Sequence, residues 1–182
     1  MSTTVKWGLI TGMVSVFFGL VSNMLGLSEK GGFTGMSLLL TVLSLGATFY
    51  TIYLGIKEAK EEKFGGYLTV GQGFKTGMGI ALIASLISFA FSLIYLNFID
   101  PDMVSRVTAV AEEQWEQQGM SEEQIEAARS MSGMFMNAWF FSLMAIVFGL
   151  FWGLIQSLIA ASILKKEAPP TLHEEPPTMP TA

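Results

Sequence analysis

The sequence predicts an all-α membrane protein with four transmembrane helices and an extracytoplasmic amphipathic helical hairpin between the third and the fourth. Four uncharged stretches, 22 to 35 residues long, divide the chain at residues 7–28, 31–56, 76–99 and 130–164. About 20 apolar residues of helix are enough to cross the hydrocarbon core of a bilayer. Charged residues make up only 14% of the chain, whereas ~25% is usual in soluble domains.

The first span is expected to be retained as an anchor and not cleaved as a signal peptide. The apolar run after Lys6 is too long for a typical signal core, and no small-x-small cleavage site follows it. No Lys, Arg, Asp, Glu or His lies inside the four stretches, so the usual sign of a proton relay or an ion path is missing. We place the spans at about residues 7–27, 33–56, 76–99 and 138–164.

The loop of residues 100–137 is predicted to form two amphipathic helices. Asp100-Pro101-Asp102 is a helix-start signal, and the run from Met103 to Gln118 has helix-forming composition. Ser121 and Gln124 then match a capping box, which predicts a second helix from Ser121 through Met134. Each helix carries an apolar face at helical spacing. These faces consist of Val104, Val107, Ala111 and Trp115 on the first helix, and Ile125, Ala128 and Phe135 on the second.

The distribution of Lys and Arg predicts that both termini are cytoplasmic. Seven of these residues (Lys6, Lys57, Lys60, Lys63, Lys75, Lys165 and Lys166) fall on one side of the four spans, and three (Lys30, Arg106 and Arg129) fall on the other. Cytoplasmic loops carry the excess of positive charge. The loop of residues 100–137, with its eight acidic residues, is then extracytoplasmic. We expect a multi-pass protein of the bacterial inner (cytoplasmic) membrane.

The chain divides into a membrane domain, residues 1–166, and a tail, residues 167–182. The tail contains five of the six prolines and few apolar residues, so it is predicted to be disordered and cytoplasmic. The only histidine, His173, is read as a solvated tail residue.

Small residues recur every four positions in three of the spans, and we expect these stripes to be the helix-packing seams. In lipid, close approach of backbones is a main source of helix association. A groove for a lipid or a small solute between the same helices is the alternative interpretation. The stripes are Gly8 and Gly12 in the first span, Gly73, Gly77, Ala81 and Ser85 in the third, and Ala145, Gly149, Gly153, Ser157 and Ala161 in the fourth.

Thr69-Val70-Gly71-Gln72-Gly73 is similar to the TVGYG filter of potassium channels. Its setting differs, because it follows Lys57–Lys63 on the predicted cytoplasmic side and Gln72 replaces the tyrosine. No strand precedes these glycines and no Gly-Lys-Ser/Thr follows, so a phosphate cradle is not predicted either. We interpret the segment as a tight entry into the third span.

Catalytic and metal-binding patterns are weak throughout. The chain has no cysteine, and its one histidine leaves no nucleophile–base pair, so no enzyme activity and no cofactor are expected. Glutamates of the outer loop, Glu112 and Glu116 among them, could gather a divalent cation, but a solvated helix face is the stronger interpretation. Met131 and Met134, with Met136, could bind Cu(I) or serve as apolar filler.

Four blocks of sequence carry a resemblance to a known family: residues 65–77 (GGYLTVGQGFKTG), 99–103 (IDPDM), 118–126 (QGMSEEQIE) and 157–166 (SLIAASILKK). They resemble a bacterial membrane family described as a domain of unknown function (four-one-nine-nine), typical of Bacteroidetes-like bacteria. The resemblance covers nearly all of the chain except the tail. It implies a four-helix inner-membrane protein with an acidic outer loop, and it implies no activity, substrate or catalytic residue.

Two functional hypotheses follow. The preferred one is a non-enzymatic accessory or interaction protein of the membrane, whose outer hairpin meets a protein partner or a second copy through Trp115. The alternative is a small transporter or lipid-binding protein for a neutral solute, with Asn23, Gln156, Ser85 and Ser88 lining a neutral path. A polar cavity reaching mid-membrane would favour transport, and a close-packed interior would favour the accessory role. The expected partner is the lipid bilayer, and no nucleic acid is expected.

Overall fold

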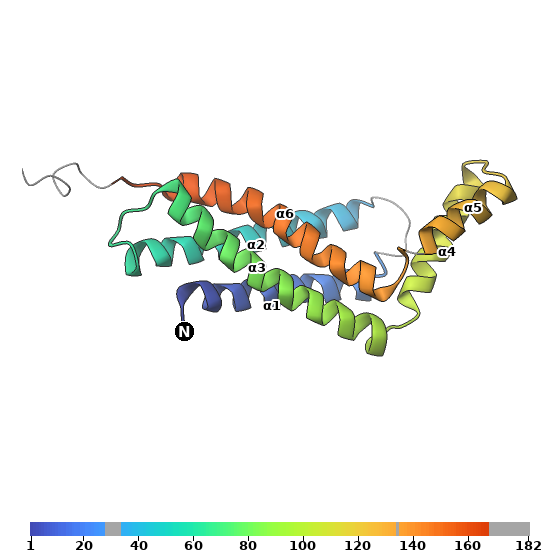
Figure 1. The fold of residues 1–182 in the computed structure, drawn as a ribbon, viewed down its shortest axis with the longest axis horizontal. Coiled ribbons are helices and arrows are strands. Elements are labelled where there is room, and N and C mark those ends of the chain that lie inside the picture. Colours follow the sequence, from blue (N-terminus) through green and yellow to red (C-terminus); the bar gives the residue numbers. More distant parts are fainter. Residues whose placement is uncertain (28–33, 134, 168–182) are drawn as a thin grey trace, which may run out of the picture.

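The computed structural model describes residues 1–27, 34–133 and 135–167, and these residues fold almost entirely into helices (Figure 1). Four of the helices, α1, α2, α3 and α6, are long and apolar enough to cross a membrane. The predicted all-α fold class is therefore confirmed. The elements are α1 (Thr3–Met24), α2 (Gly35–Glu62), α3 (Val70–Ile94), the π-helix η1 (Tyr95–Ile99), α4 (Met103–Gln117), α5 (Glu122–Gly133) and α6 (Ala138–Leu164).

The four long helices form one bundle in which α3 packs against α6 and α1, while α2 packs against α1, α6 and α3. Figure 1 shows that the N-terminus, the α2–α3 turn and the end of α6 lie at one end of this bundle. We call it the terminal end. The start of α2, the end of α3 and the start of α6 lie at the opposite end, beside α4 and α5, which we call the hairpin end.

Each long helix begins at a polar residue whose side chain accepts a hydrogen bond from a backbone amide of the first turn. These caps are Ser2 for α1, Thr34 for α2, Thr69 for α3 and Asn137 for α6. The first four amides of a helix have no partner inside it, so a capping oxygen stabilises the start of the helix.

At the terminal end, the helices extend past the uncharged stretches of the sequence. α1 includes Lys6, α2 continues to Glu62, and α3 already contains Lys75 in its second turn. Helical hydrogen bonding continues wherever the chain can form it, so charge marks the edge of the apolar stretch and not the end of the helix. At the other end, α3 passes into the π-helix η1, and the amide of Asp100 donates to the carbonyl of Tyr95 at 2.8 Å.

Helices α4 and α5 form a hairpin that projects beyond the hairpin end of the bundle (Figure 1). The predicted capping box is present, because the amide of Ser121 donates to Gln124 Oε1 at 2.9 Å and the amide of Gln124 donates to Ser121 Oγ at 3.4 Å. The predicted start signal of α4 works differently from expectation. Asp102 makes no side-chain cap, and Asp100 instead accepts a hydrogen bond from Arg106 at 2.6 Å.

Two sequence predictions fall outside the described residues. One is the disordered tail with His173, of which only Glu167 is described; the other is the role of Met134.

Candidate functional site

The predicted small-residue stripes of the third and fourth spans face each other along α3 and α6. Four glycines approach small residues so closely that an added Cβ would collide: Gly73 with Ala161, Gly77 with Ser157, Gly153 with Ala81 and Gly149 with Ser85. For Gly73, this Cβ would lie 2.7 Å from the Cβ of Ala161. Such spacing requires the absence of a side chain, as in the small-residue contacts of membrane helices. Ala145, the first residue of the stripe, is half-buried and lines a separate apolar groove with Met136 and Phe140.

Helix α1 uses its glycines differently. A Cβ on Gly8 would lie 2.7 Å from the Cβ of Ile83, and one on Gly12 would lie 2.6 Å from the Cδ1 of Ile87. Here branched side chains of α3 fill the space that the glycines leave open. The contact is therefore a large residue packed on a small one, not small on small.

The terminal end of the bundle contains a close-packed apolar core. Ile56 and Ile80 are fully buried, and their neighbours in the cluster are Ile52, Leu68, Ala160 and Leu164. Aromatic residues Trp7, Phe49, Tyr53 and Phe64 cover it. In α2, all of the buried residues, from Thr51 to Ala59, lie in the half toward this end.

Backbone hydrogen bonds between Leu68 and Lys166 join the end of α6 to the α2–α3 turn, and we call this contact the latch. Leu68 and Lys166 exchange two backbone hydrogen bonds, of 2.8 and 2.9 Å. The ammonium group of Lys60 donates to the carbonyl of Leu164 at 2.9 Å, which satisfies one of the unpaired carbonyls at the end of α6. Across the bundle, Glu58 accepts hydrogen bonds from Lys6 at 2.7 Å and from Trp7 Nε1 at 3.1 Å.

Between this core and the hairpin end lies a cavity of about 180 Å³ that touches all four long helices. No ionisable side chain lines it. Its polar groups are hydroxyls and one amide, from Thr11, Ser15, Ser44, Thr48, Ser85, Ser88 and Gln156. Apolar walls come from Leu45, Ile52, Ala81, Ala84, Phe148 and Trp152.

Some of these polar groups are satisfied within the bundle. Thr11 Oγ1 donates to Thr51 Oγ1 at 2.9 Å across the α1–α2 contact, and Ser85 Oγ donates to the carbonyl of Ala81 at 2.8 Å. Gln156 Nε2 donates to the carbonyl of Leu45 at 3.2 Å and to Thr48 Oγ1 at 3.1 Å. Three of the four residues predicted for a neutral path, Gln156, Ser85 and Ser88, therefore line one cavity, and the fourth, Asn23, lines another with Ser88.

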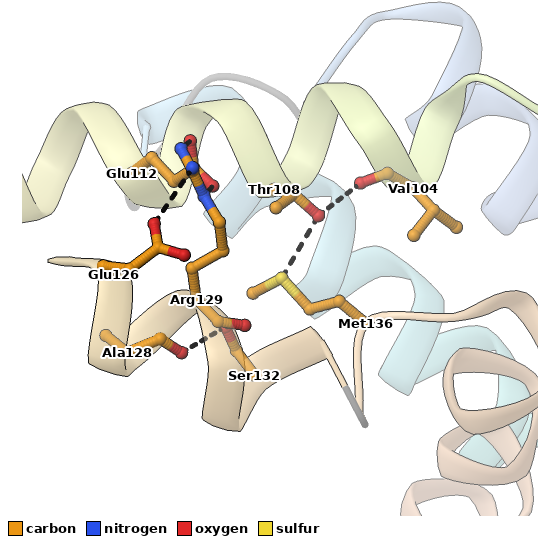
Figure 2. Close-up of polar contacts among 8 residues, drawn as sticks. All are labelled: Val104, Thr108, Glu112, Glu126, Ala128, Arg129, Ser132 and Met136. Carbon is orange, nitrogen blue, oxygen red and sulfur yellow. Dashed lines mark hydrogen bonds and ion pairs between the residues drawn. The ribbon is translucent and has the colours of Figure 1, made fainter.

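The hairpin is braced by a bidentate ion pair, in which Arg129 of α5 reaches across to Glu112 of α4 (Figure 2). Nε and Nη2 of Arg129 each donate to one carboxylate oxygen at 2.8 Å. These hydrogen bonds hold the pKa of Glu112 below its ordinary value. Nearer the bundle, Thr108 Oγ1 lies 3.1 Å from the sulfur of Met136, which ties α4 to the segment before α6.

The remaining hairpin candidates are dispersed. Trp115 is half-buried, Glu116 is exposed, and the side chain of Met131 is 73% exposed. In the part of the chain that the structure describes, no group of three acidic or His side chains is placed to hold a metal ion. Glu112 is engaged by Arg129, and Met136 faces Thr108. Among the described residues, the proposed glutamate ligands are therefore not brought together. The methionine set includes Met134, which lies outside the described residues.

The filter-like segment forms the entry to α3. The amide of Thr69 donates to Gln72 Oε1 at 3.0 Å, and the amide of Gln72 donates to Thr69 Oγ1 at 3.3 Å. This is a second capping box, so Gln72 serves the helix start where a channel filter would have tyrosine. The interpretation as a tight entry into the span is confirmed. The Thr-x-x-Gln spacing was the signal that could have identified the box from the sequence.

A family model for "Protein of unknown function (DUF4199)" matches residues 6–166. The chain belongs to this family. The match spans the four long helices and the hairpin and ends at Lys166, the last residue of the latch. No curated protein and no solved structure matches the chain. Membership of the DUF4199 family therefore assigns no activity to the chain.

Proposed function

We propose that the chain is a non-enzymatic, multi-pass protein of the bacterial inner membrane, with both termini in the cytoplasm and the hairpin outside. Four apolar helices of sufficient length support the membrane placement. The seven-to-three distribution of Lys and Arg supports the orientation. Reporter fusions after Ala182 and at Gly119, the tip of the hairpin, test it: cytoplasmic and exported signals are expected respectively, and the reverse pattern would overturn the orientation.

Within this frame, we propose that the protein acts as an accessory or interaction protein through the α4–α5 hairpin. The observation that carries the proposal is that the hairpin stands clear of the bundle and is braced internally by Arg129 and Glu112 (Figures 1 and 2). A bidentate Arg–carboxylate pair holds two elements in a defined geometry. A preformed, projecting unit reaches a neighbour without the cost of ordering a loop on binding.

The test compares full-length protein with Trp115→Ala. Two differently tagged copies are co-expressed, solubilised in mild detergent, and captured through one tag, and the second copy and any bound proteins are quantified by mass spectrometry. Trp115→Ala is expected to lower the recovery of the neighbour while membrane insertion is unchanged. Leu43→Ala, at an exposed apolar position of α2, is the matched control. Equal recovery for wild type and Trp115→Ala would contradict the proposal.

A second candidate function, binding or transport of a small neutral solute, is favoured by the cavity between the four long helices. The cavity reaches all four long helices and is lined by hydroxyls and Gln156. A bundle serving only as an anchor would gain stability from filling this space, because an unfilled cavity removes packing contacts.

A further inference from the structure

We propose that the cavity beside Gln156 is a binding site for a small, uncharged solute with a hydrogen-bond donor, and that this solute enters from the hairpin end. This inference rests on the second candidate function, since it names the site, the ligand chemistry and the side of entry.

Gln156 provides the acceptor. The residue is more than nine-tenths buried, at 7% exposure. A backbone carbonyl can only accept, so the bond to Leu45 identifies the amide nitrogen of Gln156 and leaves Oε1 as the other end of the group. Among the described residues, none donates a hydrogen bond to this oxygen. In the part of the chain that the structure describes, the side-chain atom that is fully buried without a partner is Ser157 Oγ, so Gln156 Oε1 keeps some accessible surface. Because Gln156 lines the cavity, an occupant can supply the donor that this oxygen lacks within the bundle.

Two hydroxyls add to this acceptor. Ser44 of α2 and Ser88 of α3 line the same cavity, and neither hydroxyl is hydrogen-bonded to any residue that the structure describes. Each hydroxyl both donates and accepts. The lining therefore offers the occupant one amide oxygen and two adaptable hydroxyls, in walls that are otherwise apolar.

The ligand class follows from charge and size. No charged group lines the cavity, and an ion without a counter-charge is strongly disfavoured in such surroundings. A volume of about 180 Å³ lies below the ~300–1,000 Å³ of sites for drug-sized ligands. Small amides and polyols satisfy both limits.

The side of entry follows from what lies at each end. Toward the terminal end, Ile52, Ile56 and Ile80 are buried and close the route.

Toward the hairpin end, two further cavities of about 410 and 230 Å³ share Ser15 with the first. The larger continues past Ser44 to Ser37, and the smaller continues past Ser88 to Ser92.

The chain contains no cysteine, so one introduced cysteine is the only thiol in each variant. Ser44→Cys and Ser88→Cys are compared with Ile56→Cys at the closed end. Ala127→Cys, exposed on α5, identifies the hairpin side. A membrane-impermeant thiol reagent is applied to vesicles of each orientation. Ser44→Cys and Ser88→Cys are expected to react only from the side on which Ala127→Cys reacts, and Ile56→Cys from neither. Reaction of the two serine positions from the opposite side would overturn the route.

Acetamide is the probe for the site. At about twice its dissociation constant, mass action leaves roughly a third of the sites free, so labelling of Ser88→Cys slows about threefold. Dimethyl sulfoxide, which accepts but does not donate, is expected to protect less. Gln156→Met keeps about the same volume but lacks the acceptor and also the hydrogen bonds donated to Leu45 and Thr48. Protection by acetamide is expected to disappear, and persistent labelling shows that the cavity itself is retained. Absence of protection by acetamide would leave a water-filled space only and would overturn the site. Equal protection with and without Gln156 would show that acetamide occupies the cavity without using Gln156, which would overturn the proposed acceptor.

Acetamide flux into proteoliposomes separates this inference from the function on which it rests. Protection without flux above that of empty liposomes supports the site and contradicts transport. Flux that does not depend on Gln156 supports transport and overturns the site.

Discussion

The two ends of the bundle are built from the same four helices but differ in how α2 packs against the other three. At the terminal end, glycine contacts, the apolar core and the Leu68–Lys166 latch bring all four helices together. Toward the hairpin end, α2 exposes Met36, Leu38, Leu39, Val42 and Leu43 and buries no residue, while serine-lined cavities separate it from its neighbours. The comparison shows that small residues close a helix contact only where a partner of matching shape meets them.

Substituting a glycine in the α3–α6 contact is expected to have the largest effect on the stability of the bundle. Gly153→Leu would drive its side chain into Ala81 across the α3–α6 seam, and overpacking of this kind costs about 3 kcal/mol. The melting temperature in detergent should fall clearly. Gly46→Leu in α2 is the control, because nothing lies within 4 Å of a Cβ at that position. Equal tolerance of the two leucines would mean that the seam is not closely packed.

Removing a core side chain at the latch is expected to rank next. Leu68 is 1% exposed, and truncation of a buried leucine costs about 2 kcal/mol or more because a cavity remains. Leu68→Ala should lower the melting temperature, whereas Leu38→Ala, exposed on α2, should change it little. If the two variants had the same melting temperature, the terminal end would not be the more stable part of the bundle.

Loss of one interhelical hydrogen bond is expected to have a small effect. Thr51→Val removes the partner of Thr11 at nearly constant volume, and such bonds between membrane helices contribute about 0.6 kcal/mol on average. Detergent unfolding of Thr51→Val, Thr11→Val and the double variant measures the coupling directly. A coupling energy near zero would mean that the Thr11–Thr51 contact does not stabilise this part of the bundle.

The smallest expected effect is a local response of the hairpin to acid. The hydrogen bonds from Arg129 lower the pKa of Glu112 in the folded hairpin, so the pair stabilises the hairpin above about pH 4.5, the ordinary value. This contribution is lost as the pH falls through the lowered pKa. Protection of the amides, which is the intrinsic exchange rate at each pH divided by the observed rate, should then fall in α4 and α5 but not in the bundle core. In Glu112→Gln, the amides of α4 and α5 should be weakly protected both above and below this pKa. If the variant kept the wild-type dependence of protection on pH, Glu112 would not be its cause.

Several features were predictable from local sequence because they depend on few neighbouring residues. The capping box at Ser121 and Gln124, and the one at Thr69 and Gln72, each require only two residues three positions apart. The length and apolarity of the four helices, and the spacing of small residues along them, are likewise properties of single segments of the sequence. The start of α4 was less predictable, because Asp100 could either cap the helix or bind Arg106.

The sequence by itself thus determined which segments are helices, which of these are apolar enough for a membrane, and which faces carry small residues. Only the tertiary structure decided that Gly77 meets Ser157 while Gly8 meets Ile83, that Lys60 holds the end of α6, and that Gln156 opens onto a cavity. The physical reason is that periodicity defines a face but not its partner. Packing and cavities depend on how the side chains of four helices meet, and the residues that meet can be far apart in sequence, as are Thr48 and Gln156, which are 108 positions apart.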